Sequence, residues 1–173
     1  MSQPRGTTPP VPVPPFDPSG FLPPGRHPAG RTEVADALVH AFPTSEQRPR
    51  LHNAWVGIWD ALGDALPVPK SWLGGSFVSA KDEPKDIDTC WFLDGLAFDA
   101  LPEHRQRHVM LVADSALARL QWRCDCYAVV DYPPGHPAHD AYLAVASYWH
   151  DAWGHTPPEP GGLRAARGYL EVS

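Results

Sequence analysis

The amino-acid sequence predicts an α/β domain, with a small mixed β-sheet and helices packed mainly on one side of it. Segments with the apolar spacing of amphipathic helices alternate with short runs of β-forming residues. A length of 173 residues suits one domain, and seven tryptophans, five tyrosines and six phenylalanines provide large side chains for its core. We therefore expect a single sheet of about three to five strands.

The first 28 residues differ in composition from the rest of the chain, because they hold ten of its 22 prolines. Proline fixes φ and lacks an amide donor, so this composition favours extended, solvated backbone. We expect a flexible tail over residues 1–28 and the folded domain over residues 29–173. An unstructured leader is favoured over a proline-rich ligand for a partner domain.

Four segments have the spacing of amphipathic helices. The first spans residues 32–41, and the second follows Thr44 and runs to about Leu66; Thr44 and Gln47 have the spacing of a capping box. Trp55 and Trp59 belong to the apolar stripe of the second helix, which favours the core over a stacking platform. The other two helices are expected over residues 102–122, with Leu120 facing inward, and 137–153.

Four segments favour strands, over residues 71–73, 86–93, 123–130 and 168–172, the last as an edge strand. Residues 96–101 are expected to form a loop or a weak strand. Side chains alternate between the two faces of a strand. In the third strand this places Asp125 and Tyr127 on one face, and Cys124 and Cys126 on the other.

The chemistry of the sequence is concentrated between Trp72 and Phe92. The turn at Gly74–Ser76 lets the backbone approach a ligand closely and offers amides and a hydroxyl. Asp86 and Asp88 project from the same face of a strand, about 7 Å apart. Carboxylates this close repel unless a cation lies between them, and Mg²⁺ takes oxygen ligands of this kind. A phosphate binder beside such a pair points to phosphoryl or nucleotidyl transfer.

At these residues the chain resembles a known superfamily. Gly75-Ser76, nine further residues and Asp86-Ile87-Asp88 resemble the signature of the nucleotidyltransferase fold, the DNA polymerase β-like superfamily. The longer string, Gly-Ser-Phe-Val-Ser-Ala-Lys followed by Pro-Lys-Asp-Ile-Asp, is similar to a family of small bacterial proteins within it. Strings that begin at Leu22, Phe42 and Tyr132 agree, so the resemblance covers roughly residues 20–170.

The resemblance implies a minimal nucleotidyltransferase fold with a third carboxylate on a neighbouring strand, for which Asp125 is the candidate. It implies catalysis and the binding of two Mg²⁺ ions by three residues, Asp86, Asp88 and Asp125. The terminal phosphates of a nucleoside triphosphate would then be bound by Gly74, Gly75, Ser76 and Lys81.

Two functions follow as hypotheses. The first is a Mg²⁺-dependent nucleotidyltransferase that moves a nucleoside monophosphate from a nucleoside triphosphate to a hydroxyl of RNA, protein or a small molecule. The resemblance implies a stress, toxin–antitoxin or defence role for it. The second is a non-catalytic nucleotide-binding or protein-interaction module on the same fold, and convergence of the three aspartates would distinguish the two.

The net charge and the composition of the chain limit the classes of partner that it can bind. A net charge of −6 argues against a general DNA or RNA binder, although a local basic groove stays open. No apolar run approaches the length of a membrane span, and no secretory segment opens the chain. Cys90, Cys124 and Cys126 lack the spacing of a zinc site, so we expect buried free thiols and a cytoplasmic location.

Overall fold

The structure is a computed structural model, and it describes residues 12–114, 116–158 and 160–173, without the side chains of residues 116 and 117. The first 11 residues of the expected tail lie outside the described residues.

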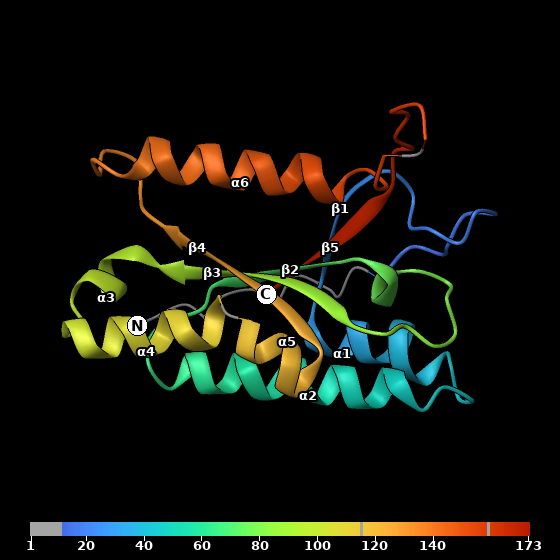
Figure 1. Cartoon of the computed structure of the whole chain (residues 1–173), viewed down its shortest axis with the longest axis horizontal. Coiled ribbons are helices and arrows are strands. Elements are labelled where there is room, and N and C mark those ends of the chain that lie inside the picture. Colours follow the sequence, from blue (N-terminus) through green and yellow to red (C-terminus); the bar gives the residue numbers. More distant parts are fainter. Residues whose placement is uncertain (1–11, 115, 159) are drawn as a thin grey trace, which may run out of the picture.

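The described chain folds around one mixed five-stranded sheet (Figure 1). Along the sheet the strands lie in the order β1-β5-β2-β3-β4. The outer pairs, β1 with β5 and β3 with β4, are parallel, and β2 is antiparallel to both of its neighbours. The strands are β1 (Gly25–Ala29), β2 (Lys70–Gly74), β3 (Ile87–Asp94), β4 (Cys124–Asp131) and β5 (Gly168–Val172).

Helices cover the two faces of the sheet unequally, as the sequence predicts. Figure 1 shows α1, α2, α4 and α5 on one face and α6 on the other. None of the described helices is both long and apolar enough to cross a membrane. The helical elements are α1 (Arg31–Ala35), its π-helical continuation η1 (Asp36–His40), α2 (Gln47–Gly63), the 3₁₀ turn η2 (Ser76–Val78), α3 (Gly95–Asp99), α4 (Glu103–Ala113), α5 (Ala116–Trp122) and α6 (His139–Trp153).

Two apolar cores result, one on each face. In the larger core Trp55 and Trp59 of α2 pack around Trp91 of β3, with ring centroids 5.3–6.4 Å apart. The prediction that the tryptophans of α2 belong to the core is therefore confirmed. The smaller core lies under α6, where Trp72 and Tyr169 of the sheet are buried with Trp153.

The folded domain begins earlier than the predicted boundary at residue 29. Leu22 is fully buried, its carbonyl accepts the amide of Gly168 at 2.9 Å, and β1 already starts at Gly25. Pro28 is tolerated because β1 is the edge strand, where one side of the backbone needs no partner. The expected edge strand, β5, is instead an interior strand between β1 and β2.

Three local predictions were wrong. Residues 96–101 overlap helix α3 rather than a strand, because the carboxylate of Asp94 caps its first turn by accepting the amide of Ala97 at 2.8 Å. The helix expected over residues 102–122 is divided into α4 and α5, since Asp114 leaves helical geometry. Leu120, expected inside, is 81% exposed.

The first turn of α2 is capped from a distant loop instead of by Thr44 and Gln47. The carboxylate of Glu83 accepts the amides of Glu46 at 2.9 Å and Gln47 at 3.1 Å, and the hydroxyl of Ser45 at 3.2 Å. These bonds keep the pKa of Glu83 below its usual value. A carboxylate supplied from outside the helix thus satisfies amides that a capping box would otherwise serve.

Arg48 makes the reciprocal connection, from α2 to the same loop. Its side chain is fully buried, and the guanidinium lies 3.7 Å from the centroid of the Phe42 ring. Burial lowers the pKa of Arg48 to about 10, so it stays charged at neutral pH. The guanidinium donates hydrogen bonds to four backbone carbonyls, those of Leu38, Phe77, Ser79 and Lys81. Arg48 therefore fixes the backbone between β2 and β3.

We predict that Arg48→Met lowers the free energy of unfolding by about 2–4 kcal/mol, because it leaves buried backbone carbonyls without hydrogen-bond donors. Urea denaturation followed by circular dichroism measures the change. Arg50→Met is the matched control, since Arg50 is exposed and, among the described residues, forms an ion pair only with the exposed Glu46 one turn before it. Equal stability of the two variants would refute the structural role of Arg48.

Candidate functional site

The structure brings Asp88 and Asp125 together on neighbouring strands. They are register partners in the parallel pair β3 and β4, and Gly74 is the partner of Asp88 on β2. Both side chains point to the face that carries α6, because their strand neighbours Cys90 and Tyr127 pack with the core under that helix. Asp86 stands just before the first residue of β3.

The Gly-Gly turn is required by its contacts with this site. Gly75 has a φ of +68°, and a Cβ placed there would overlap the Oδ2 atom of Asp88. A Cβ on Gly74 would lie 3.0 Å from the indole of Trp153. The backbone therefore approaches the carboxylate more closely than a residue with a side chain would allow.

The surroundings of Asp88 disfavour the ionised form of its carboxyl group. Burial, followed by the nearby charges of Asp86 and Asp125, raises the pKa of Asp88 to about 6, and Arg167 and Arg119 oppose the shift. Asp86 and Asp125 therefore both lie within electrostatic range of Asp88. A cation placed among them would relieve the repulsion between Asp88 and its neighbours.

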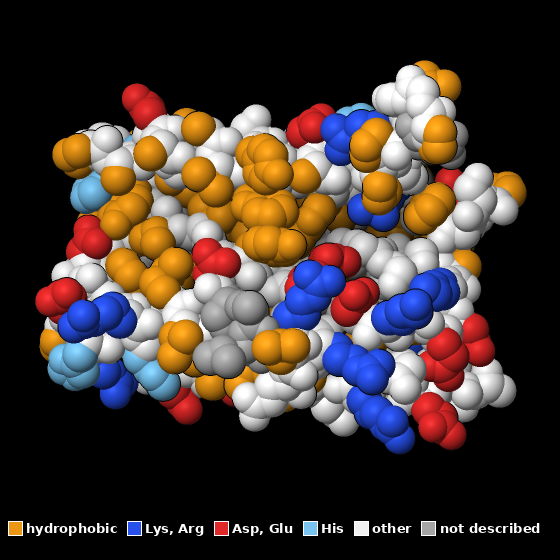
Figure 2. Space-filling model, viewed as in Figure 1, with side chains coloured by type: hydrophobic (Ala, Val, Ile, Leu, Met, Phe, Trp, Pro, Cys, Tyr) orange, Lys and Arg blue, Asp and Glu red, His pale blue; other side chains and the backbone are white. Residues whose placement is uncertain are grey.

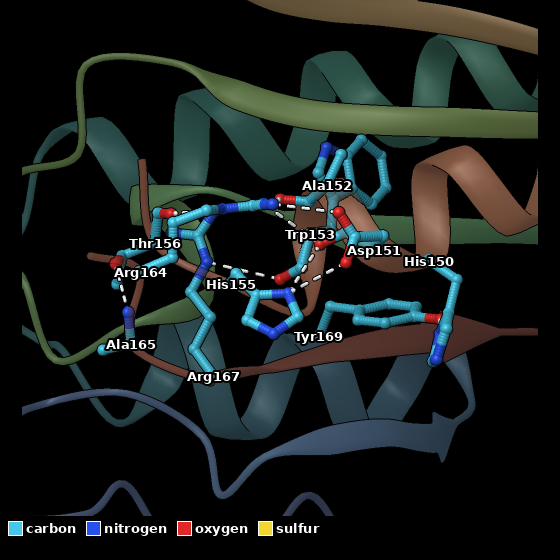
Figure 3. Close-up of polar contacts among 10 residues, drawn as sticks. All are labelled: His150, Asp151, Ala152, Trp153, His155, Thr156, Arg164, Ala165, Arg167 and Tyr169. Carbon is cyan, nitrogen blue, oxygen red and sulfur yellow. Dashed lines mark hydrogen bonds and ion pairs between the residues drawn. The ribbon is translucent and has the colours of Figure 1, made fainter. Parts of the chain in front are cut away.

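Two arginines that sequence reasoning missed lie beside the aspartates. Arg119 of α5 is 3.2 Å from the carboxylate of Asp125, and its own side chain is 64% exposed. Arg167 is half-buried just before β5, and its Nε donates to the carbonyl of Trp153 at 3.3 Å (Figure 3). On the face drawn in Figure 2, acidic and basic side chains stand side by side next to an apolar patch.

The predicted phosphate-binding residues Ser76 and Lys81 line one cleft. The cleft has a volume of about 480 Å³, and Arg167 completes its positive side. One wall comes from the segment assigned to the tail, where Phe21 forms a β-bridge with Ser79. Two cations and a hydroxyl in one cleft suit a phosphate group.

The donor set fits Mg²⁺ only with ligands from outside the protein. Among the described residues, no group of three or more His, Cys, Asp or Glu side chains is arranged to hold a metal. Mg²⁺ binds through one or two carboxylates and takes water and substrate phosphate as further ligands. Asp88 and Asp125 provide such carboxylates, and the exposed side chain of Arg119 is free to turn away from Asp125.

Other candidate ligands lie apart from this site. Asp131 is at the opposite end of β4 from Asp125, 3.7 Å from Lys70. The three cysteines are buried and free, as the sequence predicts. Burial also raises the pKa of Cys90, so its thiol stays protonated at neutral pH.

The raised pKa of Asp88 has a consequence for stability. The folded chain binds this proton more tightly than the unfolded chain, whose pKa is near 3.8, so its stability falls as pH rises from about 4 to about 6. The loss amounts to up to about 3 kcal/mol. We predict that Asp88→Asn removes this decline, which urea denaturation in EDTA at several pH values measures.

The exposed Asp64 provides the control, because Asp64→Asn should leave the pH dependence unchanged. If the stability of Asp88→Asn still falls between about pH 4 and pH 6, another carboxylate is responsible for the decline.

Comparison with curated proteins and with solved structures gives no match. Residues 14–173 match a family model described as "Family of unknown function (DUF6932)". The match includes Phe21 and β1, in agreement with a domain that begins before residue 29. The chain belongs to this DUF6932 family.

Proposed function

We propose that the chain is a Mg²⁺-dependent nucleotidyltransferase, which moves a nucleoside monophosphate from a nucleoside triphosphate to an acceptor hydroxyl. One observation carries the proposal: Asp88 and Asp125 are partners on parallel strands beside the turn at Gly74–Ser76. Paired carboxylates next to a phosphate-binding turn supply the two parts that this reaction needs.

Asp88 and Asp125 would hold the metal, which when bound neutralises charge on the triphosphate and on the leaving pyrophosphate, and Asp86 would add negative charge near Asp88. Ser76 and Lys81 bind the terminal phosphates from the cleft that they line. Arg167 adds a second positive charge to the same cleft.

The chemical step is a displacement at the α-phosphorus. The acceptor oxygen forms a bond to that phosphorus, and the bond from phosphorus to the bridging oxygen breaks. Pyrophosphate leaves with the bonding electron pair, and the carboxylate of Asp125 accepts the proton of the hydroxyl. Asp125 is suited to this role because β4 is an outer strand, which an acceptor reaches from the side.

The biological setting is part of the proposal. Resemblance to the nucleotidyltransferase superfamily supports a stress, toxin–antitoxin or defence role in a bacterial cytoplasm. The three free cysteines fit a reducing compartment.

One observation favours a second function, a non-catalytic nucleotide-binding or protein-interaction module. Arg119 contacts the carboxylate of Asp125, which satisfies this charge without a metal. In that case the cleft at Ser76 would still bind phosphate, but no nucleotide would be transferred.

We predict that the double variant Asp86→Asn, Asp88→Asn is at least as stable as the wild type without metal, because like charges are removed. It should lose the rise in melting temperature that Mg²⁺ and a nucleoside triphosphate produce in the wild type, since a ligand stabilises only the state that binds it. Melting curves measure both effects, and label transfer from triphosphates carrying a radioactive α-phosphate to cell extract measures activity.

The matched control is Asp64→Asn, Asp140→Asn, which removes the same charge from exposed positions. Stabilisation of the wild type without any label transfer would favour the non-catalytic module. If no nucleoside triphosphate stabilises the wild type, the proposed function is wrong.

A further inference from the structure

Strand β4 ends the sheet, so within the described part of the chain only one of its edges is paired. The amide of Ile87 donates to the carbonyl of Arg123 at 3.0 Å, which fixes the phase of the parallel ladder with β3. In this phase the odd-numbered residues of β4 bond to β3. The amides and carbonyls of Cys126, Ala128 and Val130 therefore point to the outer edge, and no described residue hydrogen-bonds to them.

In Figure 1 β4 runs in front of the other strands of the sheet, and no described ribbon passes in front of it. A groove of about 180 Å³ accompanies it between β4 and α6, lined by apolar side chains that include Val129, Ala141 and Val145. Figure 2 shows apolar side chains gathered on this part of the surface. Unpaired backbone groups beside an apolar groove are the two elements of recognition by strand addition.

We propose that the acceptor is a protein, and that an extended segment of it adds to β4 as a sixth strand with a serine or threonine beside Asp125. This inference rests on the proposed function and names its acceptor. The transfer is the displacement described above, with the side-chain oxygen as the attacking atom and a nucleoside triphosphate as co-reactant.

Sheet geometry brings the hydroxyl to the correct place. A residue directly opposite Asp125 on an added strand has its Cβ about 5 Å away on the same face. A serine or threonine oxygen there lies within reach of a metal held by Asp88 and Asp125.

The same geometry gives the acceptor a sequence requirement. Val129, which lines the groove, is four residues from Asp125 on the same face of β4. An acceptor segment that fills the groove while presenting its hydroxyl therefore carries an apolar side chain four positions from the serine or threonine. A spacing of three positions would put the two on opposite faces of the added strand.

Charge and access distinguish a peptide from other occupants. No basic residue occurs within β4, and the net charge of the chain is −6, which disfavours a nucleic-acid backbone along this edge. A second copy paired through β4 would also place its backbone beside Asp125, but β4 contains no serine or threonine to present there. A peptide satisfies the same backbone groups and itself delivers the hydroxyl.

The test uses the full chain, labelled with ¹⁵N, and two synthetic peptides that alternate valine and threonine between terminal lysines. One peptide has a serine and a leucine four positions apart, and the control has them three positions apart. We expect the first peptide to shift the amide resonances of Cys126, Ala128 and Val130. It should also accept label from a nucleoside triphosphate at least tenfold faster than the control.

Ala128→Pro removes one outward amide and leaves the pairing with β3 in place, since proline is tolerated at a strand edge. It should abolish the shifts and the transfer to the peptide, whereas Ala128→Ser, which keeps the amide, should retain both. Mg²⁺-dependent stabilisation by the triphosphate should be unchanged in both variants, which separates this inference from the proposed function.

Three outcomes overturn the inference. One is label transfer to RNA or a small molecule that Ala128→Pro leaves intact. The second is a wild type that binds the triphosphate but shows no shift at β4 with either peptide. The third is a dimer, measured by sedimentation, that Ala128→Pro dissociates, because β4 would then be occupied by a second copy.

Discussion

The candidate site depends on the buried guanidinium of Arg48. The chain between β2 and β3 contains Ser76, Lys81 and Asp86, and most of it lies outside regular secondary structure. Such a segment has few ladder bonds of its own, so its carbonyls need donors from elsewhere. Arg48 supplies them from α2, and Glu83 returns a carboxylate to the first turn of the same helix. The loop and the helix therefore hold each other in place.

Because the loop is fixed in this way, the fold tolerates repulsion between the carboxylates of the site. The carboxylate of Asp88 occupies the space that a Cβ on Gly75 would need, and two further carboxylates lie near it. Repulsion among these charges weakens the folded state when all of them are ionised. Such strain persists only where the surrounding structure determines the geometry, and it is common at functional sites. The buried contacts of Arg48 and the paired strands β3 and β4 provide that support. The open edge of β4 then leaves one side of the site accessible to an acceptor.

The spacing of apolar residues along the sequence predicted which face of α2 and of β4 is buried. Alternation correctly placed Asp125 and Tyr127 on one face of β4, and helical spacing placed Trp55 in the core. Asp125 as the third carboxylate came from resemblance to a superfamily and from its position after a long helix, because no local signal links it to Asp88 across the 36 residues between them. The catalytic and metal-binding roles of these aspartates stay predictions.

What the sequence did not predict depends on contacts between distant segments. Strand β1 pairs with β5, which comes from the other end of the chain. The proline-rich composition around β1 therefore did not predict a strand. Arg48 lies in the first turn of α2, but the carbonyls that it binds belong to η1 before that helix and to the segment between β2 and β3 after it. Arg119 and Arg167 belong to no motif, and only the folded sheet brings them to the aspartates.

The most direct test of the account is whether a divalent ion binds between β3 and β4. Mn²⁺ takes the same oxygen ligands as Mg²⁺, and its unpaired electrons broaden nearby amide resonances. With a nucleoside triphosphate present, small additions of Mn²⁺ to ¹⁵N-labelled protein should broaden the resonances of Asp88, Asp125 and Gly75 first. Excess Mg²⁺ should restore them. Broadening centred on Asp131, or spread evenly over the exposed acidic residues, would contradict a metal site at the paired aspartates.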